Sequence, residues 1–131
     1  MSFQVLLIED NADDVELAMR AIKKIGLSDQ VKTFGNGEEA LEYLFGQTDE
    51  DLPRIILLDL NLPKTPGLDV LRQIRLHEKT RAIPVVILTV SRKEPDLLQS
   101  FTMGISDYLI KPLEADRFIQ IYKKYVKSYP A

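Results

Sequence analysis

The sequence contains no cysteine and a single histidine, His77. Without cysteine there are no disulfides, no thiolate metal sites and no cysteine nucleophile, and one histidine cannot build a histidine-rich metal centre. Apolar runs are also short, since none exceeds four residues, and a membrane span requires far more. The amino terminus shows no basic region followed by a long apolar stretch, so we expect no secretory signal and a cytoplasmic location.

Positive charge is in slight deficit. Lysine and arginine number 17 against 20 for aspartate and glutamate, which gives a net charge of −3. Because nucleic-acid binding needs a basic surface, this balance argues against nucleic acid as the main partner. The chain has 131 residues, of which 45% are hydrophobic, and we assign residues 1–131 to a single domain with its own core.

Short apolar runs alternate along the chain with segments of helical spacing. The runs predict five strands, at about residues 4–8, 30–34, 54–58, 84–88 and 107–110. Among the helices between and after them, Gly26 ends the first, Asn36 caps the second, and Gly67 lies near the start of the third. The fourth helix has Leu97, Leu98, Phe101 and Ile105 on one side, and the fifth runs from about 113 to 127.

This alternation predicts an α/β fold with a parallel sheet covered on both faces. The uninterrupted apolar runs at 4–8, 54–58 and 84–88 suit central strands. Placing them centrally gives the flavodoxin-like (βα)5 winding, a doubly wound sheet with strand order 2-1-3-4-5. Ligands of such sheets bind beyond the carboxyl ends of the strands, at the switch point between the first and third strands.

Polar side chains stand at these carboxyl ends. Glu9 and Asp10 follow the first strand, Asp59 the third, Thr89 the fourth and Lys111 the fifth. Three carboxylates in one crevice repel one another unless a cation lies among them, and Mg²⁺ prefers such oxygen ligands. A carboxylate can also attack phosphorus, and the central position of Asp59 makes it the better nucleophile. Lys111, Thr89 and the metal would then each contact one phosphoryl oxygen.

Four motifs together resemble the receiver domain of two-component response regulators, and the resemblance covers nearly the whole chain. They are Glu9-Asp10-Asn11, Asp59-Leu60-Asn61-Leu62-Pro63-Lys64-Thr65-Pro66-Gly67, Leu88-Thr89 and Tyr108-Leu109-Ile110-Lys111-Pro112. Each falls at the strand end that the family requires. The segments 47–53, 61–64 and 88–91 are most similar to stand-alone regulators that work with phytochrome-type histidine kinases.

The resemblance implies a role for each residue at the strand ends. Asp59 would accept a phosphoryl group from a phosphohistidine of a sensor histidine kinase or phosphotransfer protein. The Mg²⁺ (or Mn²⁺) ligands would be Glu9, Asp10, Asp59 and the backbone carbonyl of Asn61. Lys111 would pair with the phosphoryl group, and its peptide bond to Pro112 would be cis.

The resemblance also implies a switch and an output surface. Thr89 would move toward the phosphoryl group, and Tyr108 would swing into the space it leaves. That change would alter the surface formed by the fourth helix, the fifth strand and the fifth helix, through which partners or a second copy would bind. We therefore expect a phosphoprotein of phosphorelay signalling, without an output domain or membrane association. It would not be an enzyme beyond assisting its own phosphorylation and dephosphorylation.

Three residues depart from the common pattern or modify it. The first acid is Glu9 where Asp is commoner, which alters the metal geometry slightly. Val90 follows the switch threonine where many receivers have alanine, and its bulk would slow access of water to Asp59. Asn61 is polar and would help to orient that water, so the phosphoryl lifetime stays open.

Two other functions use a similar layout. A phosphohydrolase of the haloacid-dehalogenase type needs a second acid two residues after the nucleophile, where this chain has Asn61. A flavin-binding protein needs a phosphate-cradling turn after the first strand, whereas residues 9–14 are acidic and would repel phosphate.

The same residues also have plain structural interpretations. Glu9 and Asp10 suit a helix amino terminus, Thr89 a helix cap and Pro112 a first helical position. Tyr108 would be an ordinary half-buried residue of the fifth strand. We expect His77 to be solvated and the lysines of the last helix, Lys123, Lys124 and Lys127, to form a solvated face.

Overall fold

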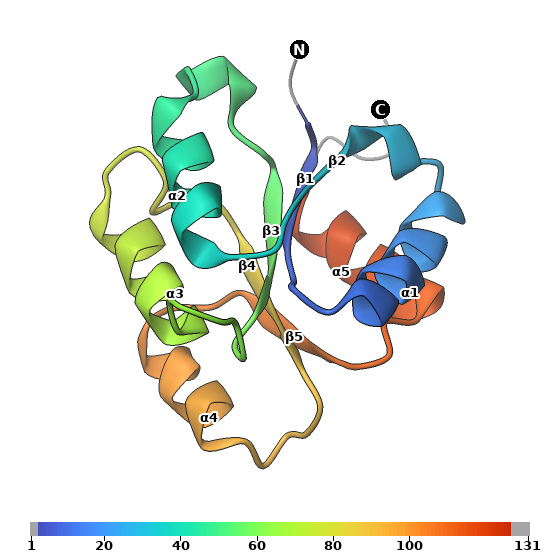
Figure 1. The fold of residues 1–131 in the computed structure, drawn as a ribbon. Helices are drawn as coiled ribbons and strands as arrows, with labels where there is room; N and C mark the ends of the chain where they lie inside the picture. Colours follow the sequence, from blue (N-terminus) through green and yellow to red (C-terminus); the bar gives the residue numbers. More distant parts are fainter. Residues whose placement is uncertain (1–2, 127–131) are drawn as a thin grey trace.

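The computed structural model describes residues 3–126, which form one sheet with helices on both faces (Figure 1). The strands are β1 (Val5–Ile8), β2 (Val31–Phe34), β3 (Ile55–Asp59), β4 (Val85–Thr89) and β5 (Asp107–Ile110). The helices are α1 (Ala12–Lys23), α2 (Gly37–Gly46), α3 (Gly67–Leu76), α4 (Pro95–Thr102) and α5 (Ala115–Tyr125). Short 3₁₀ turns, η1 (Ser28–Gln30) and η2 (Asp49–Asp51), precede β2 and β3. Every strand predicted from the sequence is present.

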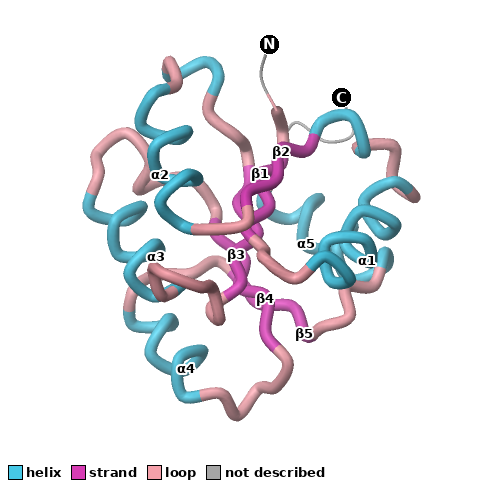
Figure 2. Tube along the Cα trace, viewed as in Figure 1, coloured by secondary structure: helices cyan, strands magenta, loops and turns pink. Residues whose placement is uncertain are grey.

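All five strands are parallel and lie in the order β2-β1-β3-β4-β5, so the predicted winding is confirmed. The three central strands β1, β3 and β4 are buried along their whole length. Figure 2 shows the strands (magenta) between two groups of helices. One face is covered by α1 and α5, and the other by α2, α3 and α4.

Alternate residues of the strands belong to two separate cores, because successive strand side chains point to opposite faces. In β1, Leu6 and Ile8 pack with α2, α3 and α4, whereas Val5 and Leu7 pack with α1 and α5. A sheet buried on both faces leaves its central strands no room for polar side chains. The polar residues therefore collect where the strands end.

Side-chain caps begin the first two helices and a glycine ends the first. The Asn11 Oδ1 accepts the Asp14 N–H at 3.0 Å, and the Asn36 Oδ1 accepts the Glu39 N–H at 2.9 Å. At the end of α1, Gly26 has φ of 78° and its N–H bonds the carbonyl of Lys23. This left-handed turn is the one for which glycine is favoured. The predicted roles of Gly26 and Asn36 are confirmed.

The apolar side predicted for α4 is wrong in part. Leu97 is buried, but Leu98 is 59% exposed and Phe101 is 49% exposed. The helix is short and contacts the sheet along the line through Leu97 and Ser100, its two buried residues. Leu98 and Phe101 each lie one position beyond that line, so they face outward. Ile105 lies beyond the end of the helix and packs on the core.

The helix starts settle two structural interpretations of the polar residues. Because α4 begins at Pro95 after Glu94, Thr89 is not its cap. Because α5 begins at Ala115, Pro112 is not at its first position. His77 is exposed at the end of α3, as expected, with its ring stacked 4.0 Å from that of Phe45. The prediction for Lys127 lies outside the described residues.

Candidate functional site

The parallel register brings the polar strand ends to one edge of the sheet. Ile8 lies opposite Leu58 and Asp59 opposite Leu88, so the residues that follow β1 lie beside the end of β3. Thr89 lies opposite Ile110, which immediately precedes Lys111. Residues separated by up to 102 positions in sequence thus meet at the predicted switch point.

Lys111 is the centre of a charged cluster. Its Nζ lies 2.7 Å from Glu9 Oε1, 3.0 Å from Asp14 Oδ2 and 3.1 Å from Asp59 Oδ2. The contacts with Asp14 and Asp59 are hydrogen bonds, in which the ammonium donates. The side chains of Glu9, Asp59 and Lys111 are only 1%, 4% and 13% exposed, so water screens these charges little.

Backbone N–H groups hold the other oxygens of the two buried acids. The Asn11 N–H donates to Glu9 Oε2 at 3.2 Å, and the Asn61 N–H donates to Asp59 Oδ1 at 3.0 Å. In contrast, Glu9 Oε1 has no hydrogen-bond partner among residues 3–126, because Lys111 contacts it as an ion pair without hydrogen-bond alignment. A buried carboxylate oxygen left in this way is suited to a further cationic ligand.

The surroundings change the proton affinities of the cluster. Burial, and after it the neighbouring Asp59 carboxyl group, raise the pKa of Glu9 from 4.5 to about 7, although Lys111 and the Asn11 N–H act in the opposite direction. Burial alone would lower the pKa of Lys111, but its contacts with Glu9 and Asp14 and the charge of Asp59 outweigh burial and raise it. Lys111 therefore remains a cation throughout the physiological pH range.

The cluster also provides the oxygen ligands of a divalent cation. Glu9, Asp10 and Asp59 each offer one carboxylate oxygen, and these atoms lie within 4.8 Å of one another. Asp10 is exposed, so the group opens to solvent on one side, as suits an ion that keeps several waters. The Glu9 carboxylate of this group includes the oxygen, Oε1, that accepts no hydrogen bond from the described residues and contacts Lys111 as an ion pair. These residues fit Mg²⁺ or Mn²⁺. The predicted Asn61 carbonyl ligand stays a prediction.

The start of α3 is pressed against the backbone that carries Asp59. A Cβ placed on Gly67 would lie 2.5 Å from the Leu60 Cα and 2.7 Å from the Asp59 carbonyl oxygen. Only glycine allows this approach, and the Gly67 N–H bonds the Leu60 carbonyl at 3.1 Å. The glycine therefore holds the segment after Asp59, including the Asn61 N–H that orients the carboxylate.

Thr89 and Tyr108 lie outside the charged cluster. The buried Thr89 hydroxyl donates to the Ser91 carbonyl at 3.1 Å and forms no hydrogen bond with Asp59 or Lys111 within the described range, although the Thr89 backbone carbonyl accepts the Lys111 N–H at 2.7 Å. The Tyr108 ring is half-buried and packs edge-on against Phe101, with ring centroids 6.0 Å apart. The structure thus brings together Glu9, Asp10, Asp59 and Lys111. Of the two predicted switch residues, Thr89 bonds the loop that leads from β4 to α4, and Tyr108 packs against Phe101 of α4. The Lys111–Pro112 peptide is cis.

Asp14 is a member of the cluster that the sequence interpretation missed. It lies in the first turn of α1, three residues after the cap Asn11, and it is 31% exposed. The sequence holds only a partial signal, because Asn11 as a helix cap shows where the first turn of α1 begins but not that this turn lies beside Lys111. The sequence interpretation assigns Glu9 and Asp10 to the metal and treats the rest of the acidic stretch 9–14 only as a feature that repels phosphate.

No helix within residues 3–126 has both the length and the apolar character needed to cross a membrane.

Comparison with known proteins identifies relatives with the same arrangement. The profile of the response regulator receiver domain matches residues 5–123. The chain is 41% identical to the probable methanogenesis regulatory protein FilR2 of Methanothrix harundinacea, over 94% of this chain and 83% of that protein. It is 36% identical to response regulator Rcp1 of Synechocystis, over 82% of this chain and 75% of that protein.

A solved structure agrees with these sequence matches. The phosphorylated cyanobacterial phytochrome response regulator RcpA superimposes with a TM-score of 0.80 at 30% identity, over 100% of both chains. The expected likeness to phytochrome-type regulators is confirmed by this match. The chain belongs to the family of response regulator receiver domains of two-component signalling.

Proposed function

We propose that this domain accepts a phosphoryl group on Asp59 from a histidine kinase or a phosphotransfer protein, in a reaction that depends on Mg²⁺ or Mn²⁺. The observation that carries the proposal is the 3.1 Å contact between Lys111 Nζ and Asp59 Oδ2, beside three carboxylates that fit a divalent cation. No small-molecule substrate is needed for this chemistry, so the domain acts as an acceptor rather than as an enzyme with its own substrate.

The residues have distinct parts in the transfer. The Asp59 carboxylate oxygen attacks the phosphorus, the P–N bond to the donor imidazole breaks, and the imidazole keeps the electron pair and takes up a proton. The Asn61 N–H keeps the carboxylate oriented during the attack. Lys111, which remains cationic, moves its contact from Asp59 Oδ2 to a phosphoryl oxygen. Glu9, Asp10 and Asp59 would hold a divalent metal ion, which would neutralise part of the negative charge on the phosphoryl oxygens.

Two relatives support this assignment of roles. RcpA has been solved in a phosphorylated form, at 30% identity to this chain. Rcp1 has been solved in a Mn²⁺-bound form, which superimposes with a TM-score of 0.76 over 97% of this chain. The residues that would take these roles here are Asp59 as acceptor and the acids Glu9, Asp10 and Asp59 as ligands. Thr89 and Tyr108 would carry the change to the surface of α4, β5 and α5. Homodimerisation through that surface and a cytoplasmic location stay predictions.

The test is phosphorylation by a small donor. We expect the wild-type protein, incubated with acetyl phosphate and Mg²⁺, to gain the mass of one phosphoryl group in intact mass spectrometry. Asp59→Asn should gain none, and a chelator should prevent the gain in the wild type. A wild type that takes no phosphoryl group under these conditions, or an Asp59→Asn variant labelled as fast as the wild type, contradicts the proposal.

A further inference from the structure

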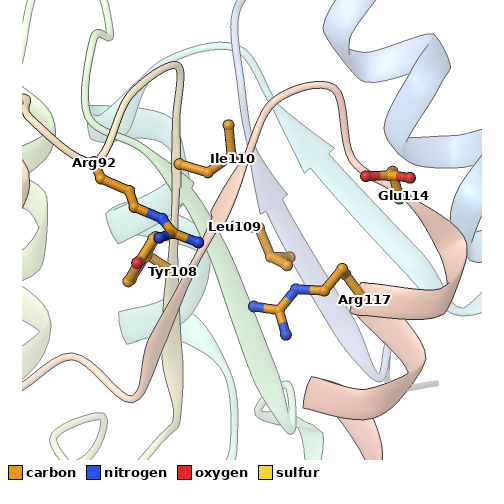
Figure 3. A pocket seen from close by; sticks show the side chains of 6 residues that line it. All are labelled: Arg92, Tyr108, Leu109, Ile110, Glu114 and Arg117. Atoms are coloured by element: carbon orange, nitrogen blue, oxygen red, sulfur yellow. The ribbon is translucent and has the colours of Figure 1, made fainter.

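Outside the charged cluster, the surface is hollowed along β5, the last strand of the sheet. The hollow has a volume of about 220 Å³ and opens between the loop after β4 and helix α5 (Figure 3). Its lining residues are Arg92, Tyr108, Leu109, Ile110, Glu114 and Arg117. None of these is needed for phosphoryl transfer, apart from the predicted switch residue Tyr108.

Two arginines reach into this hollow from different elements. Figure 3 shows Arg92, from the loop after β4, and Arg117, from α5, extending over the same stretch of β5 from opposite sides. Arg92 has no hydrogen bond or ion pair among residues 3–126, and Arg117 makes only a 3.5 Å contact with the Gln120 side chain. Glu114 also lines the hollow, but its carboxylate oxygens lie more than 4.0 Å from the nitrogens of both guanidinium groups. It therefore forms no ion pair with either arginine in the described part of the chain.

These two cations are unusual for their surroundings. The whole chain carries a net charge of −3, and the lysine of the nearby cluster already has three carboxylate partners. A guanidinium presents a planar fork of N–H donors that matches a carboxylate in bidentate fashion. Two such forks line one hollow, and neither forms an ion pair with Glu114 or with another acid of the described residues, so they are complementary to an anionic group supplied by another molecule.

The size of the hollow and its rim indicate what kind of molecule this is. Small-molecule pockets usually enclose about 300–1,000 Å³, so a hollow of about 220 Å³ suits a side chain better than a whole ligand. Two exposed apolar side chains lie at or near the hollow: Ile110, which lines it and is 37% exposed, and Phe101, which packs against the lining residue Tyr108 and is 49% exposed. Exposed apolar side chains beside unpartnered cations are typical of a protein-binding surface.

We propose that the hollow along β5 binds an acidic segment of a partner protein, with an Asp or Glu carboxylate between Arg92 and Arg117 and an apolar neighbour on Ile110 and Phe101. This deepens the proposed function and rests on it in one respect, because Tyr108 forms part of the wall and would connect the hollow to events at Asp59.

The test uses two synthetic peptides that differ only in charge. The acidic probe is an acetylated and amidated pentapeptide of sequence Asp-Leu-Glu-Leu-Glu, and its control is Asn-Leu-Gln-Leu-Gln. NMR titration at low salt follows the Arg Nε–H signals and the amides of β5. We expect the acidic peptide to shift the signals of Arg92 and Arg117, and the neutral peptide to bind at least about tenfold more weakly, because charged hydrogen bonds are lost.

Variants locate the binding. The double variant Arg92→Gln/Arg117→Gln should weaken acidic-peptide binding at least about tenfold. Arg81→Gln, a change at an exposed arginine between α3 and β4, is the matched control and should leave the affinity unaltered. Equal affinity for the two peptides, or an equal loss in the double variant and in Arg81→Gln, overturns the proposal. Melting temperatures of both variants exclude a loss caused by unfolding.

The same samples separate this proposal from the proposed function and from self-association. A wild type that binds the acidic peptide but takes no phosphoryl group from acetyl phosphate contradicts only the proposed function. A wild type that is phosphorylated but does not distinguish the peptides contradicts only the docking proposal. If raising the protein concentration alone shifts the Arg92 and Arg117 signals, and the double variant abolishes that shift, the occupant is a second copy and the partner assignment is overturned.

Discussion

The carboxyl edge of the sheet and the surface along β5 are both charged, but their charges are balanced differently. At the edge, Lys111 contacts three carboxylates at 2.7–3.1 Å, and two of these acids are almost fully buried. Along β5, Arg92 and Arg117 lie exposed over a hollow without a carboxylate partner in the described chain. The first region is organised before any ligand arrives, and the second is left for another molecule to complete.

This difference separates the chemistry from its output. Buried charges in fixed positions act strongly on a reacting group, since little reorganisation is needed at the moment of reaction. Exposed charges contribute little to folding and much to the choice of partner. A change at the edge should therefore affect stability and phosphorylation together, whereas a change along β5 should affect binding alone.

The largest effect is expected from removal of the central cation. Lys111→Met leaves Glu9, Asp14 and Asp59 without their shared partner, and breaking a buried ion pair typically costs about 3 kcal/mol or more. Urea unfolding without metal at about pH 8 should show this loss. Lys123→Met, a change at an exposed lysine of α5, should stay within about 0.5 kcal/mol of the wild type. Equal stability of the two variants would contradict the description of the edge.

The next effect is a pH dependence due to Glu9. Its pKa is raised from 4.5 to about 7 on folding, so between these pH values the folded protein binds more protons than the unfolded chain. The stability contributed by the protonated group is full below about pH 4.5 and is lost as the pH rises through 7. The loss amounts to about 3 kcal/mol in metal-free protein.

Glu9→Gln should remove this slope, because glutamine does not titrate. Glu39→Gln, at an exposed position of α2, should retain it. Urea unfolding at about pH 5 and about pH 8, with a chelator present, measures the difference for each protein. The same slope in wild type and Glu9→Gln would show that another group carries the pH dependence.

Asp14→Asn should have a smaller effect, because this side chain is 31% exposed and its ion pair is partly screened. We expect a loss of stability of about 1 kcal/mol or less. With one contact fewer to position Lys111, phosphorylation by acetyl phosphate should slow about fivefold, which corresponds to about 1 kcal/mol of activation free energy. Asp13→Asn, in the same turn of α1 and exposed, is the control. If both variants react alike, Asp14 has no part in placing the lysine.

The smallest effect on folding is expected along β5. Arg92→Gln/Arg117→Gln removes two exposed charges without an ion-pair partner in the described residues, so the free energy of unfolding should change by no more than about 0.5 kcal/mol. Thermal or urea unfolding measures this directly. A loss comparable to that of Lys111→Met would mean that the two regions do not differ as described.

Much of the fold was predictable because its physical causes are local. Three uninterrupted apolar runs predict strands buried on both faces, and their order follows from the handedness of the crossovers. The acids and the lysine were predictable as a group, since parallel strands place their carboxyl ends at one edge. Asn36 begins α2 and Gly26 ends α1, each through a contact with a residue only three positions away.

What could not be predicted depends on how elements pack. Helical spacing placed Leu98 and Phe101 with Leu97, but it does not say which line of α4 faces the sheet. Asp14 is acidic in an acidic stretch, and only the packing of α1 beside the segment that follows β5 brings it to Lys111. Arg92, in a loop, and Arg117, in α5, line the same hollow, and nothing in their sequence positions predicts that they do.

The central claim is that Asp59, rather than another acid of the cluster, receives the phosphoryl group. Borohydride reduces an acyl phosphate of aspartate to homoserine, which peptide mass spectrometry assigns to a single position. After treatment with acetyl phosphate and Mg²⁺ followed by borohydride, the account predicts homoserine at position 59 and unchanged aspartates at Asp10 and Asp14. Reduction at Asp10 or Asp14 with Asp59 intact would contradict it.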